Sequence, residues 1–228
     1  CSGREEFGVC FARRFNYLGI LFILRIAREN AETMDKKRNV MQYKLVLDQG
    51  TEKARALIVD DGGEVVNVSE REFHFKYYKD PVHNQTEVLT VQMETLWDAI
   101  KAAKLSVDDI SAFAIINRQL EVIVWEWATA SFPTVQVEWQ GKRCNLLNRK
   151  NIWKDTEKEI CKDTGRPVNY CFSPKWIKMM LDWVPSSDFC CGTEDSWLIF
   201  VLTGGCEHVT DLSNALGTTL VDPETQDW

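Results

Sequence analysis

The sequence has no apolar run long enough to cross a membrane. Its longest run, Tyr17 to Leu24, ends at Arg25 and falls far short of the ~20 apolar residues that a membrane-spanning helix needs. No small-x-small cleavage site follows this run, so a signal peptide is the minor alternative despite Arg13 and Arg14 just before it. We therefore expect a chain that does not enter a membrane.

The eight cysteines include no C-x-x-C pair and have no regular spacing. This distribution favours reduced thiols in a cytoplasmic protein over a disulfide framework. His74, His83 and His208 stand apart from any Cys or His at metal-ligand spacing. The sequence also lacks G-x-S-x-G, G-x-x-x-x-G-K-[ST], G-x-G-x-x-G and H-E-x-x-H. We expect neither a Cys/His metal site nor a common catalytic motif.

Basic residues are outnumbered by acidic ones, and the net charge is −7. A chain without an overall basic field is a poor candidate for binding nucleic acid. The charge is uneven, because residues 1–41 hold eight basic and five acidic residues, a net +3 that leaves −10 for the remainder. We interpret residues 1–41 as an N-terminal extension outside the fold, with residues 42–228 as the folded lobe. A short amphipathic helix packed on that lobe is the alternative.

From Tyr43 onward the hydrophobic pattern predicts a series of strands. Residues 43–47 and 54–59 have buried-strand patterns, and Asp60-Asp61-Gly62-Gly63 predicts a hairpin turn into a third strand over 64–75. Two more short apolar strands are expected at 110–116 and 121–125. We expect at least five strands in one sheet, the first three antiparallel.

Helices are predicted between and after these strands. Leucine and other apolar residues at 89, 93, 96, 100 and 103 mark one face of a helix over 86–104. Further helices are expected over 151–163, 174–183 and 193–202. Strands followed by a helix, a strand and further helices indicate an α/β (α+β) domain with a mixed sheet.

The turn from Asp48 to Arg55 is the most informative stretch for function. Gly50 permits close backbone approach, Thr51 offers a hydroxyl, and Asp48 is suited to holding a hydrated Mg²⁺, so the turn can present amides to a phosphate. A hairpin turn with polar residues and no ligand is the plainer interpretation, because Asp, Gly and Thr are common turn residues.

Six segments in order resemble the FGGY family of sugar kinases, and within it the glycerol kinases most closely. They read LDQGTEKARALIVDDGGEVV, INRQLEVIVW, WQGKR, CKDTGRPVNYCFSPKWIKMMLDWV, GTEDSWLIFVLTGG and HVTDLSNALGTTL, and they cover residues 43–228 almost continuously. The resemblance implies the ribonuclease-H-like lobe of the sugar kinase, actin and Hsp70 superfamily. It also implies ATP and Mg²⁺ as cofactors and a small-molecule polyol as substrate. The match ends about where the family's first lobe ends, so we expect the second lobe, with its catalytic aspartate base, to be missing here.

The resemblance assigns roles in nucleotide binding to the first turn. It implies that Asp48 binds Mg²⁺ through water, that Thr51 and the Gly50 backbone contact the transferred phosphate, and that Arg55 balances phosphate charge. The next two family positions, normally Thr and Ser, are Glu52 and Lys53 here. A carboxylate ~4 Å from a phosphate oxygen costs about 4 kcal/mol at an effective dielectric of 20. That cost would weaken nucleotide binding roughly a thousandfold, unless Lys53 offsets it or Glu52 turns away.

The resemblance also locates the polyol site, which has changed in this chain. The family grips two hydroxyls with an Arg-Glu pair, and the matching residues are Gln119 and Leu120, with Arg118 and Glu121 displaced by one position. The tyrosine that closes the glycerol site corresponds to Cys171, while the tryptophan that packs on the polyol is kept as Trp139. Losing two charge-assisted hydrogen bonds, ~1.5–3 kcal/mol each, predicts at least a hundredfold loss for glycerol.

Two hypotheses follow. The first is an ATP-dependent, glycerol-kinase-like phosphorylation of a polyol, present here as an incomplete N-terminal half. The second is a non-catalytic paralogue or truncated product that acts at most as a binding module. The motifs over 192–214 do not decide between them, because we interpret Asp195 and Ser196 as a first helical turn, Trp197 as core, and His208, Thr210, Asp211 and Asn214 as fixing a loop.

Overall fold

The computed structural model describes residues 42–50, 52–74, 85–117, 122–130, 157–165, 174, 177–178 and 188–227. The expected extension at 1–41 lies outside these residues. The described chain forms two units. The first contains the described residues up to 117 together with 199–207, and the second contains those from 122 to 198 together with 208–227.

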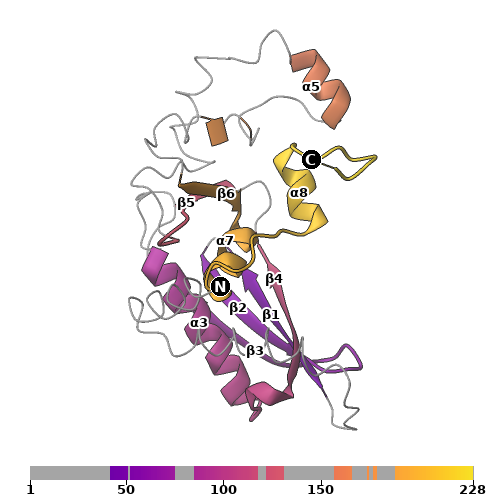
Figure 1. Cartoon of the computed structure of the whole chain (residues 1–228). Helices are drawn as coiled ribbons and strands as arrows, with labels where there is room; N and C mark the ends of the chain where they lie inside the picture. The colour runs from indigo at the N-terminus through magenta and orange to yellow at the C-terminus, as the bar shows by residue number, and fades with distance from the viewer. Residues whose placement is uncertain are drawn as a thin grey trace. The chain divides into compact units, whose positions relative to one another are not determined.

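The first unit is built on a four-stranded sheet in the order β3-β2-β1-β4 (Figure 1). The strands are β1 (Tyr43–Gln49), β2 (Lys53–Val59), β3 (Val65–Glu72) and β4 (Ile110–Ile116). β1 and β2 are antiparallel, as are β2 and β3, whereas β4 runs parallel to β1. The mixed sheet and the antiparallel arrangement of the first three strands confirm the prediction from the sequence.

A tight turn connects β2 to β3, as the Asp-Asp-Gly-Gly sequence predicts. The Gly63 N–H donates to the Asp60 carbonyl at 3.1 Å, and Gly63 has a φ of 86°. The Asp60 side chain accepts from the Glu64 N–H at 2.9 Å. Glycine adopts this left-handed conformation without a Cβ clash, so the turn reverses the chain with little strain.

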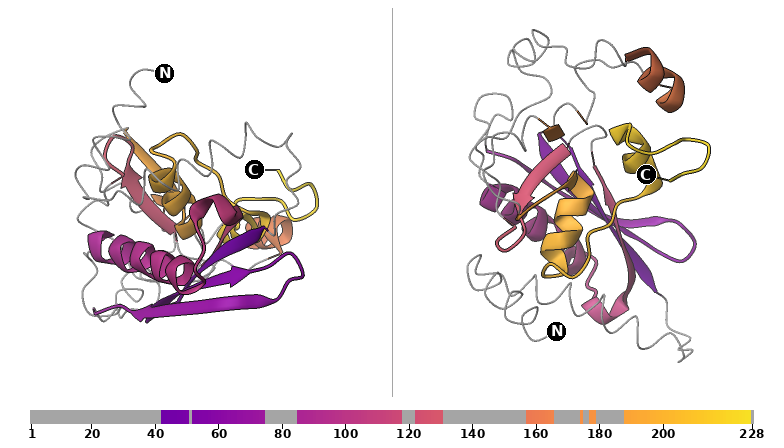
Figure 2. Two further views of the ribbon diagram at one scale, coloured as in Figure 1. Left: turned by 90° about the horizontal axis from the view of Figure 1, so that it is seen from below. Right: turned by 45° about the horizontal axis from the view of Figure 1, so that its top comes forward.

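Helix α3 (Gln85–Ala102) runs along one face of this sheet and packs against β2 and β3 (Figure 2, left). Its predicted apolar stripe is buried at Leu89, Met93, Leu96 and Ile100. Facing it are alternate residues of the strands, including Leu45, Leu47, Ala54, Ala56 and Ile58, all buried. The helix ends where Lys104 takes a φ of 57°, and a short 3-10 helix (Val107–Asp109) leads into β4. Apolar residues that repeat every ~3.6 positions along the helix and every second position along the strands thus form one core.

The second unit contains a separate two-stranded sheet, which corrects the expected five-stranded one. β5 (Val122–Glu126) pairs antiparallel with β6 (Phe189–Thr193) and not with β4. The short apolar run correctly indicated a strand at β5. A hydrophobic pattern shows that a strand is buried, but it does not show which strand pairs with it. β6 was missed because Cys-Cys-Gly-Thr carries little strand signal.

The remaining helices are α5 (Glu157–Thr164), α7 (Glu194–Leu202) and α8 (Leu212–Thr218). α7 confirms the helix expected over 193–202, with Asp195 and Ser196 in its first turn and Trp197 buried. The sequence analysis did not predict α8 and interpreted Asp211 as fixing a loop. Asp211 instead caps this helix: its carboxylate accepts from the Ser213 and Asn214 N–H groups. Of the helix expected over 174–183, residues 174 and 177–178 are described, and they are helical. Among the helices described, none has the combined length and apolar character needed to span a bilayer.

Candidate functional site

The turn between β1 and β2 closes on itself through Gly50. The Gly50 N–H donates to the Lys53 carbonyl at 3.0 Å. A Cβ built on Gly50 would lie 3.0 Å from that same oxygen, tighter than most real Cβ contacts, so glycine suits the position. The Gly50 amide is therefore engaged within the turn. Thr51 lies outside the described residues.

Asp48 and Arg55 are direct cross-strand partners at the start of this hairpin. The Arg55 Nη1 donates to Asp48 Oδ2 at 3.4 Å, and the two side chains are 47% and 31% exposed. A contact this long is weak, so the Asp48 carboxylate keeps capacity to accept hydrogen bonds from water. Asp48 and Arg55 therefore place a carboxylate and a guanidinium side by side at the end of β1.

Lys53 is paired with Glu70 of β3 and not with Glu52. Its Nζ donates to Oε1 of Glu70 at 2.8 Å and to Oε2 at 2.7 Å. This hydrogen bonding from Lys53 holds the pKa of Glu70 below its ordinary value, so Glu70 is ionised at neutral pH. Glu52 is exposed, and its carbonyl accepts from the Phe73 N–H at 2.8 Å. The sequence suggested that Lys53 could offset the charge of Glu52. The Lys53 ammonium is instead hydrogen-bonded to Glu70.

The site lies at the edge of the sheet where two parallel strands end together. Asp48 is opposite Ile116, the last residue of β4. Because the carboxyl ends of parallel strands meet at one edge, the chain that follows β4 starts beside the hairpin turn, a usual place for ligands in α/β sheets. Gln119 and Leu120 come soon after Ile116 in the sequence but lie outside the described residues, as do Trp139 and Cys171.

The residues present suit a hydrated magnesium ion better than a metal cage. Within the described part of the chain, no group of three or more His, Cys, Asp or Glu side chains could hold a metal ion. Asp48 offers one partly exposed carboxylate. Mg²⁺ commonly keeps several waters and binds through one or two carboxylates together with substrate phosphates. Asp48 is accordingly of the right chemistry to hold a nucleotide-bound Mg²⁺ through water.

The second unit has a partly buried polar network that connects residues 208–210 to β6 and α7. The Thr210 Oγ1 donates to Asp195 Oδ2 at 2.8 Å and lies 2.9 Å from Thr193 Oγ1. The Ser196 Oγ donates to the Val209 carbonyl at 2.8 Å. His208 packs edge-on against Trp125, with ring centroids 5.1 Å apart. These contacts hold residues 208–210 in place and agree with the structural role expected for His208 and Thr210.

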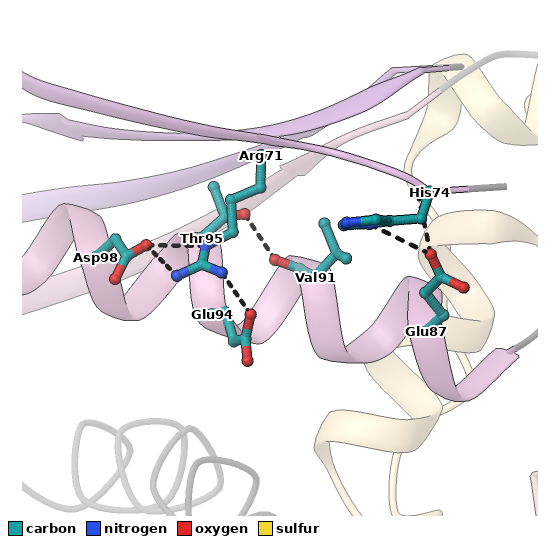
Figure 3. A network of polar contacts seen from close by, with 7 residues as sticks. All are labelled: Arg71, His74, Glu87, Val91, Glu94, Thr95 and Asp98. Atoms are coloured by element: carbon teal, nitrogen blue, oxygen red, sulfur yellow. Dashed lines mark hydrogen bonds and ion pairs between the residues drawn. The ribbon is translucent and has the colours of Figure 1, made fainter.

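A shallow depression on the α3 side of the first unit is a weaker candidate. It is lined by Arg71, Glu94, Trp97, Asp98 and Lys101. Both edges of the Arg71 guanidinium are taken, by Glu94 at 2.6 Å and by Asp98 at 2.9 and 2.7 Å (Figure 3). An arginine neutralised by two carboxylates attracts a phosphate poorly, so this depression is a poor candidate for binding phosphate.

Glu70 is the residue near the hairpin that the sequence analysis missed. It lies on β3, far from the hairpin in sequence, and reaches Lys53 and Arg55 only through strand pairing. The available signal was the run of charged residues Glu70, Arg71 and Glu72 at the end of β3. That signal could not be used, because the register between β2 and β3 is not readable from composition.

Comparison with known proteins identifies the family. The profile of the FGGY family of carbohydrate kinases, N-terminal domain, matches residues 43–228. Glycerol kinase of Bordetella pertussis is 33% identical over 197 residues, and that of Klebsiella pneumoniae is 36% identical over 200 residues. Each match covers 82% of this chain and 39% of the relative. The chain thus spans about two fifths of the length of these relatives.

Solved structures give the same result for the fold. The glycerol kinase of Plasmodium falciparum with ADP is 25% identical, with a TM-score of 0.69, over 85% of this chain and 40% of that one. A xylulose kinase from Brucella ovis, 16% identical, has a TM-score of 0.62 over 82% of this chain and 39% of that one, which supports the fold alone. The mixed α/β fold is that of the ribonuclease-H-like lobe of sugar kinases. With this fold and the family match over residues 43–228, the chain belongs to the FGGY family of carbohydrate kinases and carries its N-terminal domain.

Proposed function

We propose that residues 43–228 are the phosphate-binding lobe of a polyol kinase that transfers the γ-phosphoryl group of ATP to a primary hydroxyl, as glycerol kinases do. The observation that carries the proposal is the β1–β2 hairpin, which places Asp48 and the tight Gly50 turn at the carboxyl edge of β1 and β4. The similarity to glycerol kinases, one of them solved with ADP, supports a nucleotide as ligand.

Asp48, Thr51 and Arg55 each have a proposed part in binding. Asp48 holds the nucleotide's Mg²⁺ through water, and Arg55 beside it balances phosphate charge. The turn amides and Thr51 contact the transferred phosphate. A bound Mg²⁺ supplies charge neutralisation for the phosphates, and the catalytic work of the chain itself is positioning and electrostatic stabilisation.

The polyol side of the proposal depends on residues after β4. Gln119, Leu120, Trp139 and Cys171 are proposed to line the polyol site, and we expect them to serve glycerol poorly because charged and hydroxyl groups of the family are replaced. The general base is proposed to come from a part of the kinase outside residues 43–228. We also propose a cytoplasmic location, from the irregular cysteines, and a ligand that is a small molecule and not a nucleic acid.

The competing proposal is a non-catalytic chain. Two observations favour it: Glu52 stands where the family has a neutral residue, and Lys53 of the same turn is held by Glu70. Under this proposal the fold survives as a binding module without phosphoryl transfer.

Nucleotide binding is the first experiment. Isothermal titration with MgADP should show binding to the wild type that weakens about tenfold or more in Asp48→Asn, because a charge-assisted contact is lost. Titration with ADP in EDTA should show little difference between the two proteins. Asp108→Asn removes the same charge from an exposed site in the 3-10 helix and serves as the matched control. Equal affinities of MgADP for all three proteins would contradict the role of Asp48.

Phosphoryl transfer is the second experiment. We expect no measurable ATP:glycerol phosphotransfer by the 228-residue chain, and poor transfer after fusion to the second lobe of a glycerol kinase. In that fusion, Glu52→Thr, Lys53→Ser, Gln119→Arg, Leu120→Glu and Cys171→Tyr together should raise turnover by several powers of ten. Failure of the five changes to raise turnover in a folded fusion would favour the non-catalytic proposal. Rapid turnover by the unmodified chain, purified from a host that lacks glycerol kinase, would show that its own residues suffice.

A further inference from the structure

Three charged residues stand in line across the hairpin and the strand beside it. Asp48 of β1 is paired directly with Arg55 of β2, and Arg55 is paired directly with Glu70 of β3. Residues directly opposite one another on neighbouring strands point to the same face of the sheet. The row therefore alternates in charge, negative, positive and negative, on the face opposite the buried residues Ala54 and Ala56.

Glu70 is the end of this row that contacts both cations of β2. Besides its two short hydrogen bonds from Lys53, its Oε2 lies 3.5 Å from the Arg55 Nε. The direct cross-strand partner of Lys53 is Glu72, yet the ammonium turns to Glu70. One carboxylate thus engages the two cations nearest the turn where the phosphates are proposed to bind.

A phosphate group and Glu70 would compete for the same donors. Lys53 and Arg55 have a limited number of N–H groups that can point toward the turn, and each hydrogen bond to Glu70 removes one. At 33% to 51% exposure these side chains can rearrange without unfolding the sheet. Breaking such an exposed pair costs little, so the competition would adjust the affinity rather than abolish binding.

We propose that Glu70 is a positioning residue that holds Lys53 and Arg55 away from the turn and thereby sets the affinity of the site for phosphate-bearing ligands. The inference rests on the proposed function for the location of the phosphates. It implies that two carboxylates lower the affinity of this lobe for phosphate-bearing ligands: Glu70 on β3 and Glu52 within the turn. A purely structural Glu70 would instead stabilise the sheet without influencing anion binding.

The test is a titration of tripolyphosphate and of MgADP into the wild type and Glu70→Gln, at ionic strengths of about 0.02 and 0.2 M. Glu70→Gln should bind both ligands about three- to tenfold more tightly at the lower ionic strength, and the gain should shrink at the higher one, because exposed charges are screened. Glu72→Gln is the matched control: it removes the same charge from the same face of β3, two residues from Glu70. It should change the affinity by less than Glu70→Gln.

A second background separates release of the cations from a general loss of negative charge. In a chain that already carries Lys53→Met, adding Glu70→Gln should improve binding by less than it does in the wild type. Three results would each overturn the proposal: an equal gain from Glu70→Gln in both backgrounds, an equal gain from Glu72→Gln, or no gain from a folded Glu70→Gln. Thermal melting checks folding, and Glu70→Ala replaces Glu70→Gln if the latter melts early.

Failure of the Glu70 proposal can be distinguished from failure of the proposed function. If MgADP binds and Asp48→Asn weakens it while Glu70→Gln changes nothing, the inference fails alone. If Glu70→Gln strengthens tripolyphosphate binding while Asp48→Asn has no effect on MgADP, the inference stands and the magnesium-nucleotide assignment fails. If no variant binds either ligand, the inference is overturned.

Discussion

Asp98 on α3 accepts two hydrogen bonds from the guanidinium of Arg71 on β3, from Nε at 2.9 Å and from Nη2 at 2.7 Å. Glu94, one turn earlier, accepts a third from Nη1 at 2.6 Å (Figure 3). At the beginning of the helix, Glu87 accepts from the His74 N–H at 3.0 Å. Arg71 of β3 and His74 just after it are thus hydrogen-bonded to α3. These bonds hold an edge strand whose valines at 65, 66 and 68 are exposed.

Replacing Arg71 with Met should destabilise the first unit modestly. The side chains of Arg71, Glu94 and Asp98 are 41% to 48% exposed, so solvent screening limits the loss to about 0.5–1 kcal/mol. A Tm lower by about 2 °C is expected for a chain of this size. Lys101→Met, which removes an exposed cation from the same helix, should shift the Tm less. Equal decreases in Tm for the two variants would show that the three hydrogen bonds of Arg71 contribute no stability beyond that of an exposed cation.

Replacing Gly50 with Ala should disturb the candidate site more than it disturbs the fold. The new Cβ would meet the Lys53 carbonyl, so the turn must open by a few tenths of an ångström. We expect a loss of about 1 kcal/mol and a measurable drop in MgADP affinity. Gly63→Ala is the comparison, because it introduces strain at a φ of 86° with nothing near the new Cβ. It should cost a similar amount of stability, about 1 kcal/mol, and leave MgADP binding unchanged.

Asp211 should make the second unit sensitive to acid. Burial acts to raise the pKa of Asp211, but hydrogen bonds from Ser213 and Asn214 together outweigh it and lower this pKa below its ordinary value of 3.8. A carboxyl whose pKa is lower in the folded state stabilises the fold above its unfolded pKa, and this contribution is lost as the pH falls through the folded pKa.

The matched variant for this test is Asp211→Asn, since Asn also caps helices but does not titrate. At pH 7 we expect Asp211→Asn to be less stable than the wild type to urea. The difference should narrow as the pH falls below the ordinary pKa of an aspartate, 3.8, and through the lower pKa of folded Asp211. Other acids titrate equally in both proteins, so the comparison isolates Asp211. A difference that stays constant with pH would contradict this assignment.

Removing residues 1–33 should leave the melting temperature almost unchanged. The family match begins at residue 43, and residues 1–41 carry a net charge of the opposite sign to the remainder. Differential scanning calorimetry of the shortened and full chains gives the comparison. A loss of several degrees, corresponding to about 1–2 kcal/mol for a chain of this size, would mean that these residues pack on the fold.

The sequence alone determined the elements whose signal is local. The alternation along β1 and β2, the Asp-Asp-Gly-Gly turn and the apolar stripe of α3 each arise from residues close together in the chain, and each predicted its element correctly. The order of the six motifs was likewise enough to indicate the family, which the profile over residues 43–228 confirms.

Strand partners and charge partners were decided only in the tertiary structure. Nothing local in β5 distinguishes pairing with β4 from pairing with β6, because both give a buried apolar strand. The same holds for Lys53: the sequence places it beside Glu52, but successive side chains of an extended chain point to opposite faces, and the sheet brings Glu70 to it from 17 residues away. The residues of the candidate turn were therefore readable from the sequence, whereas the carboxylate that engages its cations depends on the register of β3 against β2.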